Sequence, residues 1–365
     1  MLEVQLSLPM RGAALAVAEC FTLAGETIAI FGPSGVGKTR LLRSLAGLDA
    51  RDAGRAVGAI RYDGTLLLDS ARGVYVPAHK RPIAYAAQRP ALFAHLSVAE
   101  NIAFAAKRSY PGAPQMHDVI ALLGLAPLLK QRPDTLSGGE QLRVALARAA
   151  VQGAPLLLLD EPMAALDRPA KLAMMDAIET LQSAFGISIL LVSHALEDVL
   201  RLASHSLILS AGGCLAYGPT LEVFERIDQS QALGQFDVGS IFAATVSAHD
   251  TALYLTQLDV RGLPLSMPLL ERIALGSSVR LRVRARDVAI ARARPQGLSI
   301  RNIVPATVVK IQQSGDSAFV DVTLQFAGQT LLARITRAAL QELALSPGDD
   351  VFALIKSVSF DRRMF

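Results

Sequence analysis

The hydrophobic positions of the first 230 residues form short apolar runs that alternate with longer stretches of mixed polarity. Residues 27–31, 155–161 and 187–194 contain the runs "TIAIF", "LLLL" and "ISILLV". Strands that are buried on both faces of a parallel sheet have this composition. The stretches between them, such as 168–185, are long enough to form helices that cover the sheet. The pattern therefore predicts an α/β fold with a largely parallel sheet.

The pattern changes after about residue 229, where short alternating stretches replace the helical ones. In 279–286 every second residue is apolar and the other four are arginines, and 318–326 alternates in the same way. Such strands, separated by turn signals, are typical of a small barrel of the OB type. We therefore predict an α/β domain over 1–230 and an all-β, OB-like barrel domain over 231–365.

The second part also contains a repeat, because "ATV" opens two segments, at 244–246 and at 306–308. An alternating strand pair follows in each segment. Next come a leucine-rich piece, 268–275 or 337–345, that we expect to be helical, then a glycine turn and a last strand. The repeat predicts two related half-units packed together as one barrel pair.

The hydrophobic content of 52% and the mean hydropathy of +0.37 raise the question of a membrane span. The longest apolar runs are far shorter than the roughly 20 residues that a spanning helix needs. The N-terminus lacks a basic region followed by an apolar run and a cleavage site, so no secretory signal is predicted. Two cysteines, Cys20 and Cys214, cannot form a disulfide framework, which favours a reduced, cytosolic compartment.

The net charge of +4 is too small to indicate a nucleic-acid partner. Residues 1–230 carry 21 Lys and Arg against 21 Asp and Glu, and 231–365 carry 15 against 11. Arginines gather in 280–294, but no aromatic residues lie between them. One solvated face of an alternating strand is the simpler interpretation, and no nucleic-acid binding is predicted.

The segment "GPSGVGKT" fits the pattern G-x-x-x-x-G-K-[ST] and stands between the predicted strand 27–31 and a predicted helix. Its glycines let the backbone wrap phosphates, Lys38 reaches the β- and γ-phosphates, and Thr39 ligates Mg²⁺. We therefore predict a nucleotide site. It comprises Gly32, Pro33, Ser34, Gly35, Val36, Gly37, Lys38 and Thr39.

Two adjacent carboxylates, Asp160 and Glu161, end the predicted strand 155–161. Ligands of a parallel sheet bind at this edge. Asp160 suits the coordination of Mg²⁺, and Glu161 can activate a water for attack on the γ-phosphate. By itself the pair could simply cap a strand, but the phosphate loop upstream favours the catalytic interpretation.

Two further candidates are His194 and Gln88. A lone histidine at a strand end is more often structural, but His194 ends the run 187–194 and should lie along the same sheet edge. The amide of Gln88 suits contact with Mg²⁺ or water, although taken alone Gln88 is more simply a surface residue.

The order of these motifs resembles that of ABC transporter ATPase subunits. The resemblance covers about 1–230 and rests on 32–39, Gln88, "LSGGEQ" at 136–141, 156–162, "AALD" at 164–167 and His194. It implies a P-loop NTPase domain that hydrolyses ATP, with Glu161 as the base and with His194 and Gln88 as sensors of the γ-phosphate. The ligands of Mg²⁺ would be Thr39, Gln88 and Asp160.

The resemblance also implies a head-to-tail homodimer, in which the segment "LSGGE" of one chain closes over the ATP of the other. The residues that would act across the dimer are Ser137, Gly138, Gly139, Glu140 and, in the following loop, Asp167. This sequence departs from the family at two points. The first 20 residues contain no aromatic residue that could stack on adenine, since Phe21 is expected in the core, and Ala165 replaces a common serine.

The second part of the chain is similar to the small molybdate-binding barrel domain over about 296–362. The segments "SIRN" and "KS" would surround a tetrahedral oxyanion, which needs several donors and positive charge. The candidate donors are Ser299, Arg301, Asn302, Lys356 and Ser357. An ordinary surface turn is the alternative interpretation of "SIRN".

Together these similarities imply the ATPase subunit of a bacterial molybdate importer, peripheral to the cytoplasmic face of the cell membrane. The expected partners are a second copy of the chain, two membrane-spanning permease subunits and an extracytoplasmic molybdate-binding protein. Internal molybdate or tungstate is a candidate regulator. The alternatives are an importer for sulfate, iron or a sugar, a soluble oxyanion-sensing regulator, and a soluble ABC protein.

Overall fold

The computed structural model describes residues 1–10, 14–49, 56–210, 213–226, 239–270, 273–313, 318–356 and 359–361. The chain divides into two compact units, Met1–Val223 and Phe224–Phe365. The predicted boundary between 230 and 231 lies outside the described residues.

One mixed sheet forms the centre of the first unit. Its strands run in the order β6-β5-β4-β1-β2-β11-β10-β3-β9-β8-β7 among the residues that the structure describes. Strands β10, β3, β9, β8 and β7 are parallel, whereas β1, β2, β4, β5 and β6 form antiparallel pairs. The strand bounds are β1 Leu2–Leu8, β2 Leu15–Phe21, β3 Thr27–Phe31, β4 Val57–Tyr62, β5 Thr65–Asp69, β6 Val74–Tyr75, β7 Ile83–Ala86, β8 Leu156–Asp160, β9 Ser188–Ser193, β10 His205–Ser210 and β11 Gly213–Pro219.

The three apolar runs of the sequence form β3, β8 and β9, and every residue of these strands is buried. Alternate side chains of β8 face two different cores. Leu157 and Leu159 belong to a core shared with α2, α3, α4 and α5, whereas Leu156 and Leu158 belong to a core shared with α1 and β1. The predicted parallel α/β fold is therefore confirmed, with a helical layer against each face of these strands.

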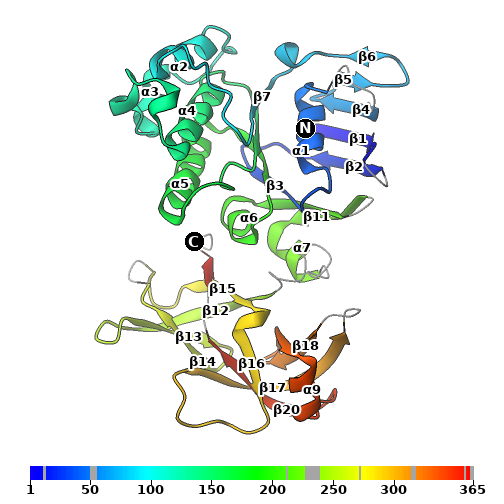
Figure 1. Ribbon diagram of the computed structural model, residues 1–365, viewed down its shortest axis with the longest axis vertical. Helices are drawn as coiled ribbons and strands as arrows, with labels where there is room; N and C mark the ends of the chain where they lie inside the picture. Colours follow the sequence, from blue (N-terminus) through cyan, green and yellow to red (C-terminus); the bar gives the residue numbers. More distant parts are fainter. Residues whose placement is uncertain are drawn as a thin grey trace. The chain divides into compact units, whose positions relative to one another are not determined.

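Helices α2, α3 and α4 lie together, well apart from the antiparallel strands β1, β2, β4 and β5 (Figure 1). The helix predicted over 168–185 is α5, with the same bounds. No helix among the described residues is long and apolar enough to cross a membrane. The helix bounds in this unit are α1 Lys38–Ala46, α2 Val98–Ala106, α3 Met116–Leu122, α4 Gly138–Ala150, α5 Arg168–Phe185, α6 Leu196–Leu202 and, across the unit boundary, α7 Thr220–Arg226.

The second unit has two five-stranded sheets within its described residues, in the orders β14-β13-β12-β15-β21 and β16-β20-β17-β18-β19. Apolar side chains from both sheets share one core, in which the Phe242 and Phe326 rings pack edge to face. The element bounds are β12 Gly239–Asp250, β13 Leu255–Val260, β14 Leu263–Pro268, β15 Ser278–Arg284, β16 Val288–Ala291, β17 Asn302–Gln313, β18 Phe319–Phe326, β19 Gln329–Thr336, α9 Arg337–Glu342, β20 Asp350–Ile355 and β21 Ser359–Asp361.

The predicted repeat is confirmed by the topology of these sheets. Strands β12, β13, β14 and β15 match β17, β18, β19 and β20, and the register of β12 and of β17 shifts directly after "ATV" in both copies. The remaining strands are exchanged. The chain passes from β15 into β16, which pairs with β20 of the other half, and β21 pairs with β15. The two halves are thereby joined into one folded unit.

Two expectations for this unit are wrong. The described residues of 268–275 form no helix, because the Leu269 and Leu270 amides donate to Tyr254 and to the Thr256 hydroxyl. The arginines of 279–286 do not all face solvent either. Arg282 is only 4% exposed, so its side chain is covered although it stands on the face that the alternation marks as polar.

Candidate functional site

Residues 32–37, which we call the phosphate-type loop, join β3 to α1 as the sequence predicts. It borders a cavity of about 490 Å³, whose lining residues are Met10, Ser34, Gly35, Gly37, Lys38, Thr39, Arg40, Arg43, Asp49 and Glu161. The carbonyls of Gly32 and Pro33 accept hydrogen bonds from Lys38, and Val36 packs against the core around α1. The loop and the first turn of α1 thus present backbone amides and one ammonium group to a space of nucleotide size.

The Lys38 side chain is held within the loop. It is 4% exposed, and its Nζ donates to the carbonyls of Gly32 at 2.7 Å and of Pro33 at 2.9 Å. Burial lowers the pKa of Lys38, and the nearby Glu161 and Asp160 carboxylates act in the opposite direction. An ammonium group that donates to neutral carbonyls can donate more strongly to charged phosphate oxygens.

Asp160 ends β8 and is 2% exposed. The hydroxyl of Thr39 donates to its Oδ1 and that of Tyr85 to its Oδ2, both at 3.0 Å. Burial raises the pKa of Asp160, although both hydrogen bonds and Lys38 oppose this shift. Burial next to Asp160 also raises the pKa of the Tyr85 hydroxyl, which therefore stays a donor. Hydroxyl and carboxylate oxygens, such as those of Thr39 and Asp160, are ligands that Mg²⁺ prefers.

Glu161 follows Asp160 with a φ of 47°, in the left-handed region that non-glycine residues rarely adopt. Its amide donates to the Val192 carbonyl at 3.1 Å, which ties this turn to β9. Such local strain costs on the order of 1 kcal/mol or more and is common where a fold must aim a functional side chain. The Glu161 carboxylate faces the loop and lines the nucleotide-sized cavity.

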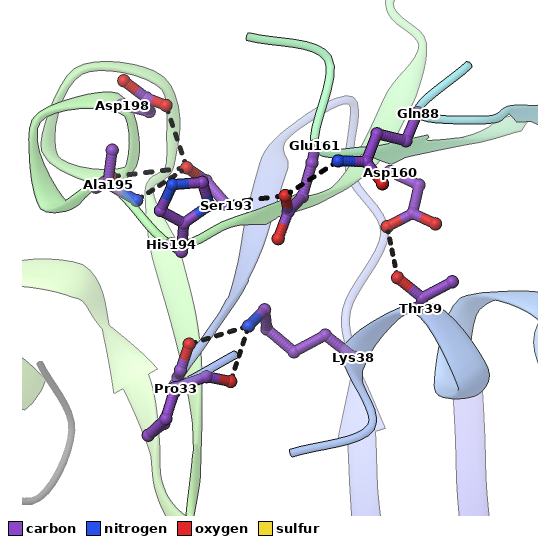
Figure 2. A network of polar contacts seen from close by, with 11 residues as sticks. Pro33, Lys38, Thr39, Gln88, Asp160, Glu161, Ser193, His194, Ala195 and Asp198 are labelled. Atoms are coloured by element: carbon purple, nitrogen blue, oxygen red, sulfur yellow. Dashed lines mark hydrogen bonds and ion pairs between the residues drawn. The ribbon is translucent and has the colours of Figure 1, made fainter. Parts of the chain in front are cut away.

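Gln88 and His194 meet at one oxygen of Glu161 (Figure 2). The Gln88 amide donates to Oε2 at 3.3 Å, and His194 Nδ1 lies 3.3 Å from the same atom. The His194 side chain is 50% exposed and that of Glu161 is 18% exposed. Three predicted residues from separate strand ends are therefore brought together beside the phosphate-type loop.

The predicted trans residues stand at two helix starts. Ser137 and Glu140 form a capping box at the start of α4, in which Glu140 Oε2 accepts from the Ser137 amide at 2.8 Å. Gly138 is exposed, and Gly139 leaves room next to Ala170. Asp167 caps α5 by accepting from the Ala170 amide at 2.9 Å. None of these residues lines the cavity beside Lys38, so their predicted contact with a partner's nucleotide stays a prediction.

The structure places two of the described candidates for the oxyanion site, Arg301 and Lys356, side by side. Asn302 opens β17 and pairs with Ile355, which places Arg301 and Lys356 next to each other at the strand ends. Ser299, Arg301 and Lys356 are exposed, and Ser357 lies outside the described residues. The Asn302 amide is 7% exposed and bonds the backbone of Ser266 twice. Oxyanion binding here stays a prediction.

Several residues near the site were not predicted. Tyr85 shares Asp160 with Thr39, and a strand-end tyrosine three residues before Gln88 could have signalled this position. Ser193, Asp198 and Lys171 form a polar cluster behind His194. Their contacts depend on how α5 and α6 pack, which no local motif indicates.

Comparisons with known proteins fit this geometry. A family model described as "ABC transporter" matches residues 21–164, and one described as "TOBE domain" matches 298–360. The "Molybdenum import ATP-binding protein ModC" of Mesorhizobium japonicum is 41% identical over 99% of this chain and 96% of that protein. The protein of the same name from Aromatoleum aromaticum is 43% identical over 99% of this chain and 91% of its own length.

A solved structure also matches part of the chain. A dimeric post-hydrolysis structure of the ATP-binding cassette MJ0796, bound to ADP and Pi, is 23% identical with a TM-score of 0.49. The match covers 60% of this chain and 99% of that one.

Proposed function

The chain belongs to the family of ABC-type molybdenum import ATP-binding proteins, and from this membership we propose that it hydrolyses ATP to drive molybdate import. The observation that carries the proposal is the convergence of Gln88 and His194 on the Glu161 carboxylate, beside the cavity of the phosphate-type loop. A binding protein without catalysis would not need this arrangement.

The phosphates of ATP would occupy the cavity along 32–39. Lys38 Nζ would exchange the carbonyls of Gly32 and Pro33 for β- and γ-phosphate oxygens, which are charged and therefore stronger acceptors. Thr39, Asp160 and Gln88 offer the oxygen ligands that would hold Mg²⁺. When bound, Mg²⁺ would neutralise charge on the β- and γ-phosphates.

Glu161 acts as the general base in this proposal. It takes a proton from a water whose oxygen attacks the γ-phosphorus, the bond to the ADP oxygen breaks, and the products are ADP and phosphate. His194 and Gln88, each 3.3 Å from Glu161 Oε2, fix the direction of that carboxylate and contact the γ-phosphate. Catalysis of phosphoryl transfer consists almost entirely of such positioning together with electrostatic stabilisation.

The active form would be a homodimer with two composite sites. Ser137, Gly138, Gly139 and Glu140 of one chain would contact the γ-phosphate held by the other, because the exposed start of α4 offers free amides and the positive end of a helix dipole. Asp167 would cross the dimer to the opposite site. Closure of the dimer over ATP would be the step coupled to transport.

Transport requires partners outside this chain. We infer two membrane-spanning permease subunits, to which the dimer binds at the cytoplasmic face of the membrane, and an extracytoplasmic molybdate-binding protein. Internal molybdate or tungstate bound near Ser299, Arg301 and Lys356 would regulate the machine. The names of the relatives and the match of 298–360 to a TOBE domain support this part of the proposal.

Uptake of labelled molybdate tests the proposal in cells that lack this chain and retain the other components. Reintroducing the chain should restore uptake, whereas Lys38→Ala and Glu161→Gln should not. Excess tungstate should compete more strongly than excess sulfate. Restored uptake of sulfate, iron or a sugar, without molybdate, would instead assign another solute, and full uptake with Glu161→Gln would refute the role of the base.

A further inference from the structure

A smaller cavity of about 150 Å³ lies on the other side of Glu161 and His194. Its wall includes three polar residues to which the proposed mechanism gives no role, namely Ser193, Asp198 and Lys171. Asp198 is 3% exposed and belongs to α6, whereas Lys171 belongs to α5. The cluster therefore joins two helices directly behind the proposed catalytic pair.

The cluster forms a continuous chain of polar contacts. Lys171 Nζ lies 2.5 Å from Asp198 Oδ1, and the Ser193 hydroxyl donates to Asp198 Oδ2 at 2.9 Å. The Ala195 amide donates in turn to Ser193 Oγ at 3.0 Å. These last two bonds span the turn that carries His194 (Figure 2). The Ser193 hydroxyl, which Asp198 holds, thus links the residues on both sides of the histidine.

Lys171, at the other end of this series of polar contacts, is bonded to Asp167. Lys171 lies one turn into α5, and its amide donates to the Asp167 carbonyl at 2.8 Å. Asp167 itself caps this helix and is exposed. A shift of Asp167 would move the first turn of α5, and with it the ammonium group that Asp198 binds.

We propose that Lys171 and Asp198 are positioning residues that hold the His194 turn against the start of α5 and transmit the position of Asp167 to the His194–Glu161 contact. The inference rests on the proposed function, because it requires His194 and Glu161 to act in ATP hydrolysis. In a homodimer, engagement of Asp167 by the partner would then set the geometry of the histidine on its own chain.

A second ion pair between the same helices provides a matched control. Arg201 of α6 donates to Glu179 of α5 at 2.8 and 3.2 Å and also to Asp176. Arg201 thus binds two carboxylates of α5 at positions well after Lys171 in that helix. If the role of the Lys171–Asp198 pair were only to hold α5 and α6 together, breaking either pair should affect ATP turnover alike.

The test compares the full-length chain with Lys171→Met/Asp198→Leu, a pair of apolar replacements that leaves no unpaired buried charge. We expect kcat to fall about 100-fold, as for a displaced catalytic group. The KM for ATP and the ATP-dependent dimerisation seen by sedimentation should stay unchanged. Arg201→Met should lower the melting temperature and leave kcat as in the unaltered chain. Equal kcat in the Lys171→Met/Asp198→Leu and unaltered chains would overturn the proposal.

Two further variants keep the test decisive if the double replacement does not fold. Ser193→Ala removes the bond to Asp198 and should also lower kcat, whereas Ser193→Thr keeps the hydroxyl and should restore it. When Asp167→Ala is already present, adding Lys171→Met should lower kcat little further, because the proposal places both residues in the same series of contacts that leads to His194. Additive effects would refute transmission from Asp167. An unaltered chain without ATPase activity would refute the proposed function itself, whatever the variants do.

Discussion

Replacement of Asn302 by leucine tests how the second unit is held together. Asn302 Oδ1 accepts from the Ser266 amide at 2.7 Å, and its Nδ2 donates to the Ser266 carbonyl at 2.9 Å. These bonds tie β17 of one half-unit to β14 of the other. Ser240 of β12 is the counterpart of Asn302 in the other half of the repeat. Its Oγ accepts a hydrogen bond from the Leu332 amide of β19 at 2.7 Å.

The two substitutions should differ in size for a structural reason. Asn302→Leu removes two hydrogen bonds of about 1 kcal/mol each and leaves the partly buried N–H and C=O of Ser266 without these partners, so we expect a loss of about 3 kcal/mol of unfolding free energy. Ser240→Ala removes one bond and should cost about 1 kcal/mol. Because Asn302 and Ser240 occupy equivalent positions in the two half-units, the stability loss at one can be compared directly with the loss at the other.

Amide hydrogen exchange in the full-length chain measures both effects locally. When exchange follows the opening equilibrium, a loss of about 3 kcal/mol speeds exchange of the Ser266 amide on the order of 100-fold. Ser240→Ala should speed exchange at Leu332 by about 5-fold. Unchanged exchange at Ser266 in Asn302→Leu, together with lost molybdate binding, would refute the structural role and make Asn302 an oxyanion ligand instead.

Three further outcomes follow from the first unit. Gly32→Ala places a Cβ 2.3 Å from a carbonyl oxygen of β10 and should lower the unfolding free energy by about 3 kcal/mol or more. Gly35→Ala meets no atom within 4 Å and should lower it by about 1 kcal/mol, so equal urea midpoints of the two variants would contradict this reasoning. Burial raises the pKa of Asp160, so the folded chain binds its proton more tightly than the unfolded chain. Stability of the nucleotide-free protein should therefore fall as pH rises from the ordinary carboxyl range through the raised pKa, and this slope should disappear in Asp160→Asn. Burial also raises the pKa of Cys214 to about 12, so iodoacetamide at pH 8 should label the exposed Cys20 and spare Cys214, as peptide mass spectrometry would show.

The sequence predicted the catalytic edge of the sheet because its signals are local. Strands β3, β8 and β9 are buried along their whole length around apolar runs, and Asp160, Glu161 and His194 stand at the strand ends or directly after them. Parallel strands bring such ends to one edge, so their proximity follows from the strand pattern alone. The repeat was predictable for a similar reason, since each half carries its own strand order and turn.

Contacts that depend on packing could not be predicted in this way. Lys171 meets Asp198 only because α5 and α6 pack side by side, and the exchange of β16 and β21 depends on how two halves close. The burial of Arg282 has the same origin, because an alternating strand shows which side chains share a face but not what covers that face. The left-handed conformation of Glu161 carried no sequence signal either.

The release of phosphate from ATP by the purified chain, compared with its Glu161→Gln variant, tests the central claim most directly. The account predicts steady turnover by the unaltered chain. It predicts turnover at least about 100-fold slower for Glu161→Gln, which should accumulate as an ATP-bound dimer because the amide cannot accept the proton of the attacking water. Equal rates for the two proteins, with no trapped dimer, would contradict the assignment of Glu161 as the base.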